Sequence, residues 1–131
     1  MQVTIMKTKA LTTKPEPPRR SACPVANTLD RVGDKWSLLL VRDMLAGKKT
    51  YGQFLESPEG IPTNILADRL RRLEDLGIIK RSPYQERPVR YAYTLTAAGR
   101  QLGRVLRALA DWGLENISGT KKELGPGSFV P

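Results

Sequence analysis

Residues able to act as acids, bases, nucleophiles or metal ligands are scarce in this chain, which has no histidine and a single cysteine, Cys23. Without histidine there is no imidazole for general acid–base catalysis, for activating a serine or cysteine nucleophile, or for the usual zinc sites. The sequence also has no phosphate-binding loop. We therefore predict that the protein is not an enzyme and has no catalytic residue, no metal site and no cofactor.

Basic side chains are the abundant chemical groups. The chain has 22 Lys and Arg against 13 Asp and Glu, a formal net charge of +9 and a pI near 10.1. Between residues 69 and 107, ten basic residues stand against three acidic ones, a local charge of +7. A concentrated positive segment favours a polyanionic partner, either nucleic acid or an anionic membrane surface.

A helix expected over residues 63–76 carries the side chains best suited to reading DNA. Leu66, Leu70 and Leu73 form one apolar stripe, and at 100° per residue the opposite side is polar. The candidate DNA-binding residues of this helix are Thr63, Asn64, Ala67, Asp68, Arg71 and Arg72. Asn pairs with adenine, Arg with guanine or phosphate, and Ala can meet a thymine methyl group. Because an ordinary solvated helix has a similar composition, neighbouring elements must decide between the two interpretations.

Two strands expected over residues 78–84 and 89–95 enclose a short polar tip at residues 85–88. Arg87 lies at this tip and Arg90 follows it, so both are candidate contacts to the minor groove or to phosphates. Arg90 alternates away from the inward-facing tyrosines, and a structural ion pair is the alternative use of its charge. A hairpin directly after the polar helix favours DNA binding over a merely solvated face.

The elements before this helix are helices with clear start and stop signals. Pro24 begins the first helix, and Gly33 is expected to end it as a glycine cap. Asp34 is an N-cap for the second helix, and Thr50 is one for a short third helix over residues 51–55. The expected buried stripe of the second helix consists of Trp36, Leu39, Leu40 and Met44.

A long last helix follows the hairpin, from the N-cap Thr96 to about Ile117. The order of elements predicts a mainly α winged helix-turn-helix with a small β-hairpin wing. A domain of this size fills its core with the middle helices and the hairpin, so the first and last helices are expected to pair across a homodimer. The alternative is that the apolar stripe of the last helix is ordinary monomer core. The candidate interface residues are Val25, Leu29, Leu102, Val105, Leu106, Leu109 and Trp112.

The two ends of the chain differ in composition from the middle. Residues 1–20 are basic and rich in Lys, Thr and Pro, which predicts a disordered arm. Residues 21–118 are expected to form the DNA-binding and dimerisation domain, and residues 119–131 a flexible tail. Since no apolar run is long enough to span a membrane and no signal peptide is evident, we expect a cytoplasmic protein without a membrane partner.

Four blocks of sequence resemble the HxlR-type winged helix regulators, a family related in architecture to the MarR regulators. The blocks are CPVANTLDRVGDKW at 23–36, GIPTNILADRLRRLEDLGII at 60–79, PVRYAYTLTAAG at 88–99 and DWG at 111–113. The chain departs from the family at Asp34, where a second glycine is common, and at Pro58, where an aliphatic residue is usual. The resemblance implies homodimers built from the first and last helices, two recognition helices on a palindromic operator in double-stranded DNA, and regulation of a nearby gene. We expect a repressor.

Some members of this family sense oxidants or electrophiles through a cysteine at the position of Cys23. The thiol lies at the expected start of the first helix, where the helix dipole favours a thiolate, and Arg19 and Arg20 lie just upstream. A small electrophile or oxidant is therefore a candidate inducer. The alternative, a small packed residue at the beginning of the helix, is equally consistent with the sequence.

The residues leave a second class of function open. A winged helix can also bind protein or RNA without operator specificity. Steep salt dependence and a strong preference for one duplex sequence distinguish an operator-binding regulator from such a module.

Overall fold

The computed structural model describes residues 18–121, so the expected arm up to residue 17 and the tail from residue 122 lie outside the described residues. Within this range the chain forms five α-helices and one antiparallel hairpin. They are α1 (Pro24–Val32), α2 (Ser37–Leu45), α3 (Tyr51–Leu55), α4 (Thr63–Asp75), β1 (Ile79–Glu86), β2 (Val89–Leu95) and α5 (Ala97–Asn116). The mainly helical fold with a hairpin wing, as the sequence predicts, is confirmed.

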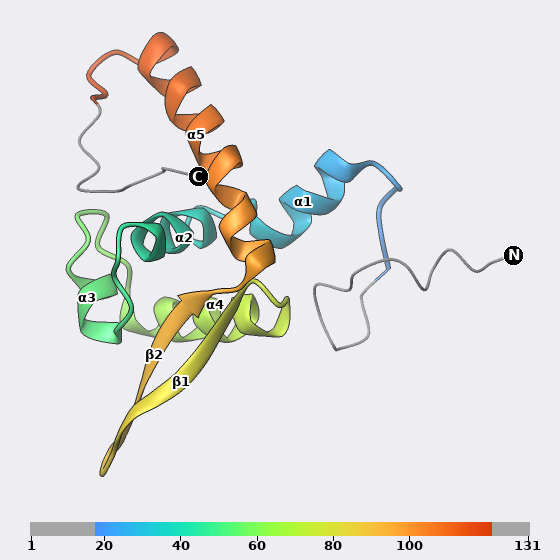
Figure 1. Cartoon of the computed structure of the whole chain (residues 1–131). Coiled ribbons are helices and arrows are strands. Elements are labelled where there is room, and N and C mark those ends of the chain that lie inside the picture. The colour runs from blue at the N-terminus through green and yellow to red at the C-terminus, as the bar shows by residue number, and fades with distance from the viewer. Residues whose placement is uncertain (1–17, 122–131) are drawn as a thin grey trace, which may run out of the picture.

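Helices α2, α3 and α4 lie around the base of the long helix α5, while the hairpin projects from one end of the molecule and α1 from one side (Figure 1). Helix α2 packs against both α5 and β2, and α4 packs against β1. The backbone N–H of Tyr93 donates to the carbonyl of Lys49 at 2.8 Å, which ties β2 to the segment before α3. The hairpin, α1 and the outer half of α5 thus extend beyond the shared core.

Threonine caps fix the starts of two helices. The Thr50 hydroxyl accepts from the backbone N–H of Gln53, while the Gln53 side chain accepts from the backbone N–H of Thr50, a complete capping box. The Thr96 hydroxyl accepts from the backbone N–H of Gly99 at 3.1 Å and donates to the carbonyl of Gly77 at 2.7 Å. Both caps confirm the sequence prediction, and the second also holds α5 to the end of α4.

Glycines mark two close approaches and one turn. Gly77 follows α4 with φ +78°, the left-handed region that favours glycine. A Cβ at Gly99 would lie 2.1 Å from the carbonyl oxygen of Ile78, so the first turn of α5 rests directly on the residue before β1. Gly33 is the C-cap of α1, as the sequence predicts, and its φ of −82° lies outside the left-handed region. A Cβ there would meet the carbonyl oxygen of Leu29 at 2.4 Å, so close approach accounts for this glycine.

The hairpin is longer and its tip narrower than the sequence predicts. Strand β1 runs to Glu86, which pairs with Val89, so that only Arg87 and Pro88 remain in the turn. At the other end Ile79 pairs with Leu95, and both side chains are buried. The hairpin is therefore anchored in the core at its base and exposed at its tip.

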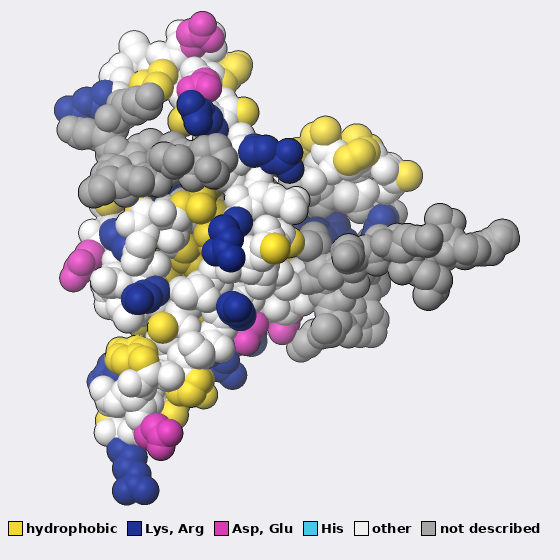
Figure 2. Space-filling view, in the orientation of Figure 1, with side chains coloured by type: hydrophobic (Ala, Val, Ile, Leu, Met, Phe, Trp, Pro, Cys, Tyr) yellow, Lys and Arg dark blue, Asp and Glu magenta, His cyan; other side chains and the backbone are white. Residues whose placement is uncertain are grey.

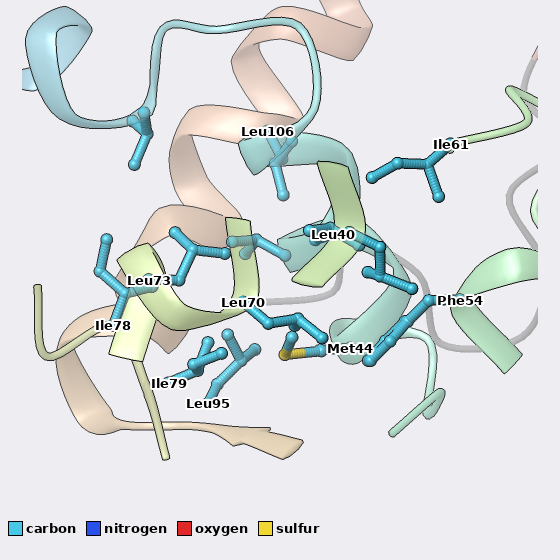
Figure 3. Packing of buried hydrophobic residues seen from close by; sticks show 13 residues of the cluster. Leu40, Met44, Phe54, Ile61, Leu70, Leu73, Ile78, Ile79, Leu95 and Leu106 are labelled. Carbon is cyan, nitrogen blue, oxygen red and sulfur yellow. The ribbon is translucent and has the colours of Figure 1, made fainter. Parts of the chain in front are cut away.

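The hydrophobic core lies between α2, α4, α5 and the base of the hairpin (Figure 3). Its buried members are Val32, Leu40, Val41, Met44, Phe54, Ile61, Leu66, Leu70, Leu73, Ile78, Ile79, Leu95 and Leu106. The apolar stripe predicted for α4 is confirmed, since all three of its leucines are buried. This burial decides which side of α4 faces solvent.

Helix α2 buries a different set of residues from the expected stripe. Leu40 and Met44 are buried as predicted, but Trp36 and Leu39 are only half-buried. Val41, which the stripe omits, is fully buried. The reason is that α2 packs on two sides, against α5 and against β2, so that one stripe does not describe its buried surface.

Candidate nucleic-acid interface

Helix α4 presents a polar face to solvent beside the projecting hairpin (Figure 1). The predicted DNA-binding residues on its exposed side are Thr63, Asn64, Ala67 and Arg71, with Asp68 partly exposed among them. The Arg71 side chain is 68% exposed, enough to reach a partner beyond the protein surface. The first turn of α4 also offers backbone N–H groups and the positive end of a helix dipole to a phosphate.

Arg72 has a different role from the one predicted. Its Nη2 donates to the backbone carbonyl of Asp30 at 2.7 Å, which ties α4 to α1. This bond joins residues 42 positions apart, and helical periodicity alone cannot reveal it. Arg72 therefore supports α1 through this bond, and Arg71 is the more exposed of the two arginines.

A chain of charged side chains runs from the start of α2 to the exposed side of α4. Arg69 donates from Nε to the carboxylate of Asp34 at 2.8 Å and from Nη1 to the carboxylate of Asp68. Arg71 donates from Nη2 to the other oxygen of Asp68 at 3.1 Å. The sequence analysis does not single out Arg69, because its partner Asp34 is 35 positions away.

Asp34 is held at the N-terminus of α2 by several donors. It accepts from the backbone N–H groups of Trp36 and Ser37, each at 3.1 Å, and from the Ser37 hydroxyl at 2.6 Å. Burial raises the pKa of Asp34, but hydrogen bonds from the Ser37 hydroxyl, from Arg69 and from the two backbone groups outweigh it and lower the pKa to about 2. Asp34 thus binds backbone N–H groups at the start of α2, as a cap does, although the N-cap position itself is Trp36, two residues later than predicted. The ion pair with Arg69 adds a second role.

The variant Asp34→Asn is expected to lower the free energy of unfolding by about 1–2 kcal/mol at neutral pH. Because the folded-state pKa of Asp34 lies below its unfolded value, the carboxylate stabilises the fold fully above about pH 4 and loses this effect as the pH falls toward 2. Urea unfolding at neutral pH and near pH 2 should show the difference at neutral pH and its disappearance in acid. Asp111→Asn, on an exposed position of α5, is the matched control. An equal loss in the control, or a difference that persists near pH 2, contradicts this role.

A second polar cluster fixes the loop that leads into α4. The buried carboxylate of Asp43 accepts from the Ser57 hydroxyl at 2.6 Å and from Nε of Arg42 at 3.0 Å. Arg42 also donates to both oxygens of Glu59 at 2.8 Å, and this hydrogen bonding raises the pKa of Arg42. The hollow beside the cluster has room for about one water molecule, so it is no ligand pocket. Local sequence patterns do not reveal this cluster, which ties α2 to the loop before α4 through bonds between distant residues.

The wing places two arginines near its exposed end. Arg87 and Arg90 are both exposed, and neither forms an ion pair with any residue in the described range. The structure thus gives no support to a structural ion pair for Arg90. Nearer the base, Arg81 lies over the ring of Tyr91 at 4.2 Å and pairs with Glu74 at 3.5 Å, which stiffens the hairpin against α4. Figure 2 shows a basic side chain at the outermost point of the hairpin.

Large apolar side chains are exposed on α1 and α5. Val25 and Leu29 of α1 are 65% and 56% exposed, and Figure 2 shows hydrophobic side chains gathered on the outer side of this helix. On α5, Leu109 and Trp112 are 53% and 61% exposed. Further exposed apolar residues on and after α5 are Val105, Leu114 and Ile117. An exposed apolar surface of this kind on a charged protein typically marks an interface.

Leu106 does not belong to this exposed surface. Its side chain is 5% exposed and is part of the monomer core, where it points toward α2 (Figure 3). Its assignment to the dimer interface is therefore wrong. Leu102 is half-buried and packs against the same core. One turn further along α5 the core ends, and the apolar residues there remain exposed.

Cys23 lies at the N-cap position of α1 and is exposed. One of the two interpretations of the sequence was that Cys23 is a small packed residue. The exposed thiol contradicts that interpretation within the monomer. Arg20, expected to act on the thiol, instead forms an ion pair with Asp30 at 2.6 Å. This pair, at the end of the predicted arm, holds the chain before α1 against the helix.

Metal sites and membrane spans are both absent from residues 18–121. No group of three or more His, Cys, Asp or Glu side chains in this range could hold a metal ion. No helix in the same range has both the length and the apolar character to cross a membrane.

Known proteins match this chain over most of its length. A family model described as HxlR-like helix-turn-helix matches residues 31–121. The HTH-type transcriptional regulator sll1512 of Synechocystis sp. is 42% identical over 94 residues, which cover 69% of this chain and 70% of that protein. The redox regulator HypR in its oxidised form is 37% identical, with a TM-score of 0.65, over 72% of this chain and 97% of HypR. Its reduced form is 35% identical, with a TM-score of 0.68, over 73% and 95%.

Proposed function

The chain belongs to the HxlR-like helix-turn-helix family of transcription regulators, and from this premise we propose that it is a repressor that binds a palindromic operator as a homodimer. The observation that carries the proposal is the exposed face of α4, where Asn64, Ala67 and Arg71 lie free of the core beside a projecting hairpin. Such a regulator acts on chromosomal DNA, and we place it in the cytoplasm.

In this proposal α4 enters the major groove. Asn64 and Arg71 are the side chains that pair with base edges, adenine for the amide and guanine for the guanidinium, and Ala67 meets a thymine methyl group. Thr63 and the first backbone N–H groups of α4 bind the adjacent phosphate. Asp68 can accept from the amino group of a cytosine. Together these contacts would determine which base sequence the protein selects in one half-site.

The wing supplies contacts that depend less on sequence. Arg87 at the tip and Arg90 beside it would lie along the minor groove and its phosphates. Their charges are free of ion pairs with the described residues, so they need not give up a protein partner to bind phosphate. The wing therefore adds affinity and orientation, while α4 selects the sequence.

The second copy of the chain would cover the exposed apolar sides of α1 and α5. Val25, Leu29, Val105, Leu109 and Trp112 remain in the proposed interface, to which Leu114 and Ile117 are added. Two recognition helices in such a dimer would lie about 34 Å apart, one turn of DNA. Two-fold symmetry of the protein then requires an inverted repeat in the operator.

Selection from a pool of random duplexes tests this function. The full chain is expected to enrich an inverted repeat whose half-sites are about 10 base pairs apart. Binding to the enriched duplex should exceed binding to a shuffled duplex by about 10³-fold or more and weaken steeply with salt. Equal binding to all duplexes, or preference for RNA of the same sequence, would favour the alternative of an interaction or RNA-binding module.

The exposed Cys23 extends the proposal to an oxidant or electrophile as inducer. It lies at the start of α1, part of the proposed dimer interface, so an adduct or cross-link there would change how two copies meet. The similarity to HypR, a redox regulator solved in both oxidised and reduced forms, supports the same view.

Treatment with diamide or a quinone is expected to reduce operator binding of the wild-type protein by tenfold or more, roughly the coupling typical of a regulated site. Cys23→Ser should bind the operator normally and resist the treatment, because Cys23 is the only thiol in the chain. Fluorescence anisotropy before and after treatment measures both. Equal losses in the two proteins, or no loss in either, would contradict thiol sensing and leave DNA binding unaffected.

A further inference from the structure

We propose that Arg69 is a positioning residue for sequence reading: it links the start of α2 to Asp68 and thereby holds Arg71 in the position from which it reads DNA. The proposal rests on the function proposed above and adds the residue that orients its main arginine. Arg69 is 20% exposed, and it acts from behind the DNA-facing surface without touching DNA.

The inner end of this link is rigid. Asp34 is bound by two backbone N–H groups and one hydroxyl at the N-terminus of α2, so its carboxylate has a fixed direction. The Nε of Arg69 donates to this carboxylate at 2.8 Å. The Arg69 side chain thus begins on α4 and is bonded to the start of α2. These two attachments together fix the position of its guanidinium nitrogen atoms.

The outer end of the link passes through Asp68. One oxygen of Asp68 accepts from Nη1 of Arg69 and the other from Nη2 of Arg71. Each oxygen of Asp68 thus accepts from one arginine and keeps a lone pair that can still accept from a base, and the carboxylate links the partly buried Arg69 to the exposed Arg71. The pair of Asp68 and Arg71, three residues apart on a helix surface, would by itself be weak. Arg69 strengthens it by removing the rotational freedom of the carboxylate.

This arrangement has a direct consequence for recognition. An arginine that is 68% exposed normally loses much side-chain freedom when it pairs with a base. Because Asp68 already holds Arg71, part of this ordering is complete before DNA arrives. The two arginines also neutralise Asp68, so that its charge does not repel the phosphates beside the groove. The ordering of Arg71 favours the operator, where Arg71 reads a base, over other duplexes, whereas the neutralised charge of Asp68 helps binding to any duplex.

A thermodynamic cycle tests the link. Arg69→Met keeps the aliphatic stem and removes the guanidinium, and Arg69→Lys keeps the charge but not the fork that reaches two carboxylates. The probe is the duplex of about 30 base pairs enriched by the wild-type protein, with a shuffled duplex for reference. In the wild-type background each variant is expected to lower the ratio of specific to non-specific affinity about fivefold, and in the Arg71→Ala background less than twofold. Equal losses in both backgrounds, or no loss in the first, would overturn the proposal.

Side-chain NMR of the free protein tests the same link without DNA. With ¹⁵N-labelled arginine, rotation of the Arg71 guanidinium is expected to be restricted in the wild-type protein and to become free in either Arg69 variant. Arg104→Met, at an exposed position of α5, is the matched control and should leave the Arg71 signal unchanged. A freely rotating Arg71 in the wild-type protein would overturn the link. A restricted Arg71 in a protein that binds every duplex equally would instead overturn the proposed function and leave the link in place.

Discussion

If the chain forms the proposed dimer, the double variant Leu109→Glu, Trp112→Glu is expected to convert it into a folded monomer and to weaken operator binding by about 10²-fold or more. Both side chains are more than half exposed on α5, so the monomer fold does not depend on them. Two glutamates in an apolar interface would each be buried without a partner, which costs several kcal/mol or more and disfavours association. A monomer would hold only one half-site, which removes the gain from binding both halves together.

Light scattering and operator titration measure the two effects in the same samples. The matched control is Arg104→Gln, Arg107→Gln, which changes the net charge by the same −2 on exposed positions of α5 that are not among the proposed interface residues. The control should remain dimeric and lose only the affinity that follows from its charge. A dimeric glutamate variant with normal binding would show that α5 is not the interface. Leu106→Glu is unsuitable for this purpose, because it would place a carboxylate in the monomer core.

On the recognition helix, Arg71→Ala and Asn64→Ala are each expected to weaken operator binding by about 1–3 kcal/mol, roughly 5- to 150-fold. Binding to a shuffled duplex should change little in either variant, since base contacts carry the preference and phosphate contacts do not. Each variant should also relax the preference at one base pair of each half-site. Titrations with single-base substitutions in the duplex locate that pair.

The wing variant Arg87→Ala is expected to behave differently from the two α4 variants. It is expected to weaken the operator and the shuffled duplex alike and to reduce the slope of affinity against salt, because Arg87 is placed to bind phosphate. All three residues are exposed in the structure, so melting temperatures should stay close to that of the wild type. Unchanged operator binding in Arg71→Ala and Asn64→Ala, with the fold intact, would remove α4 from the role of recognition helix.

The fold could be predicted largely because its signals are local. The capping residues Thr50 and Thr96 bond to backbone groups within three residues, and the leucine stripe of α4 repeats within one helix. Such patterns are complete in a short stretch of sequence. The exposed face of α4 follows directly, because burial of one stripe leaves the opposite side to solvent.

What failed to follow from the sequence depends on packing between distant segments. Leu106 and Leu109 belong to one apolar stripe of α5, and the helical repeat does not distinguish them. Contact with the core buries Leu106, whereas Leu109 lies beyond the core and is exposed. Arg69 and Arg72 are both polar positions of α4, and their partners Asp34 and Asp30 lie 35 and 42 positions away. No local pattern separates an arginine that supports the fold from one that reaches outward, such as Arg71.

Hydroxyl-radical footprinting of the enriched duplex tests the central claim most directly, because it shows where on DNA the two copies of α4 lie. If a dimer inserts two recognition helices into successive turns of the major groove, each strand should show two protected stretches about 10 base pairs apart, arranged symmetrically about the centre of an inverted repeat. A single protected stretch, or uniform weak protection along the whole duplex, would contradict the account.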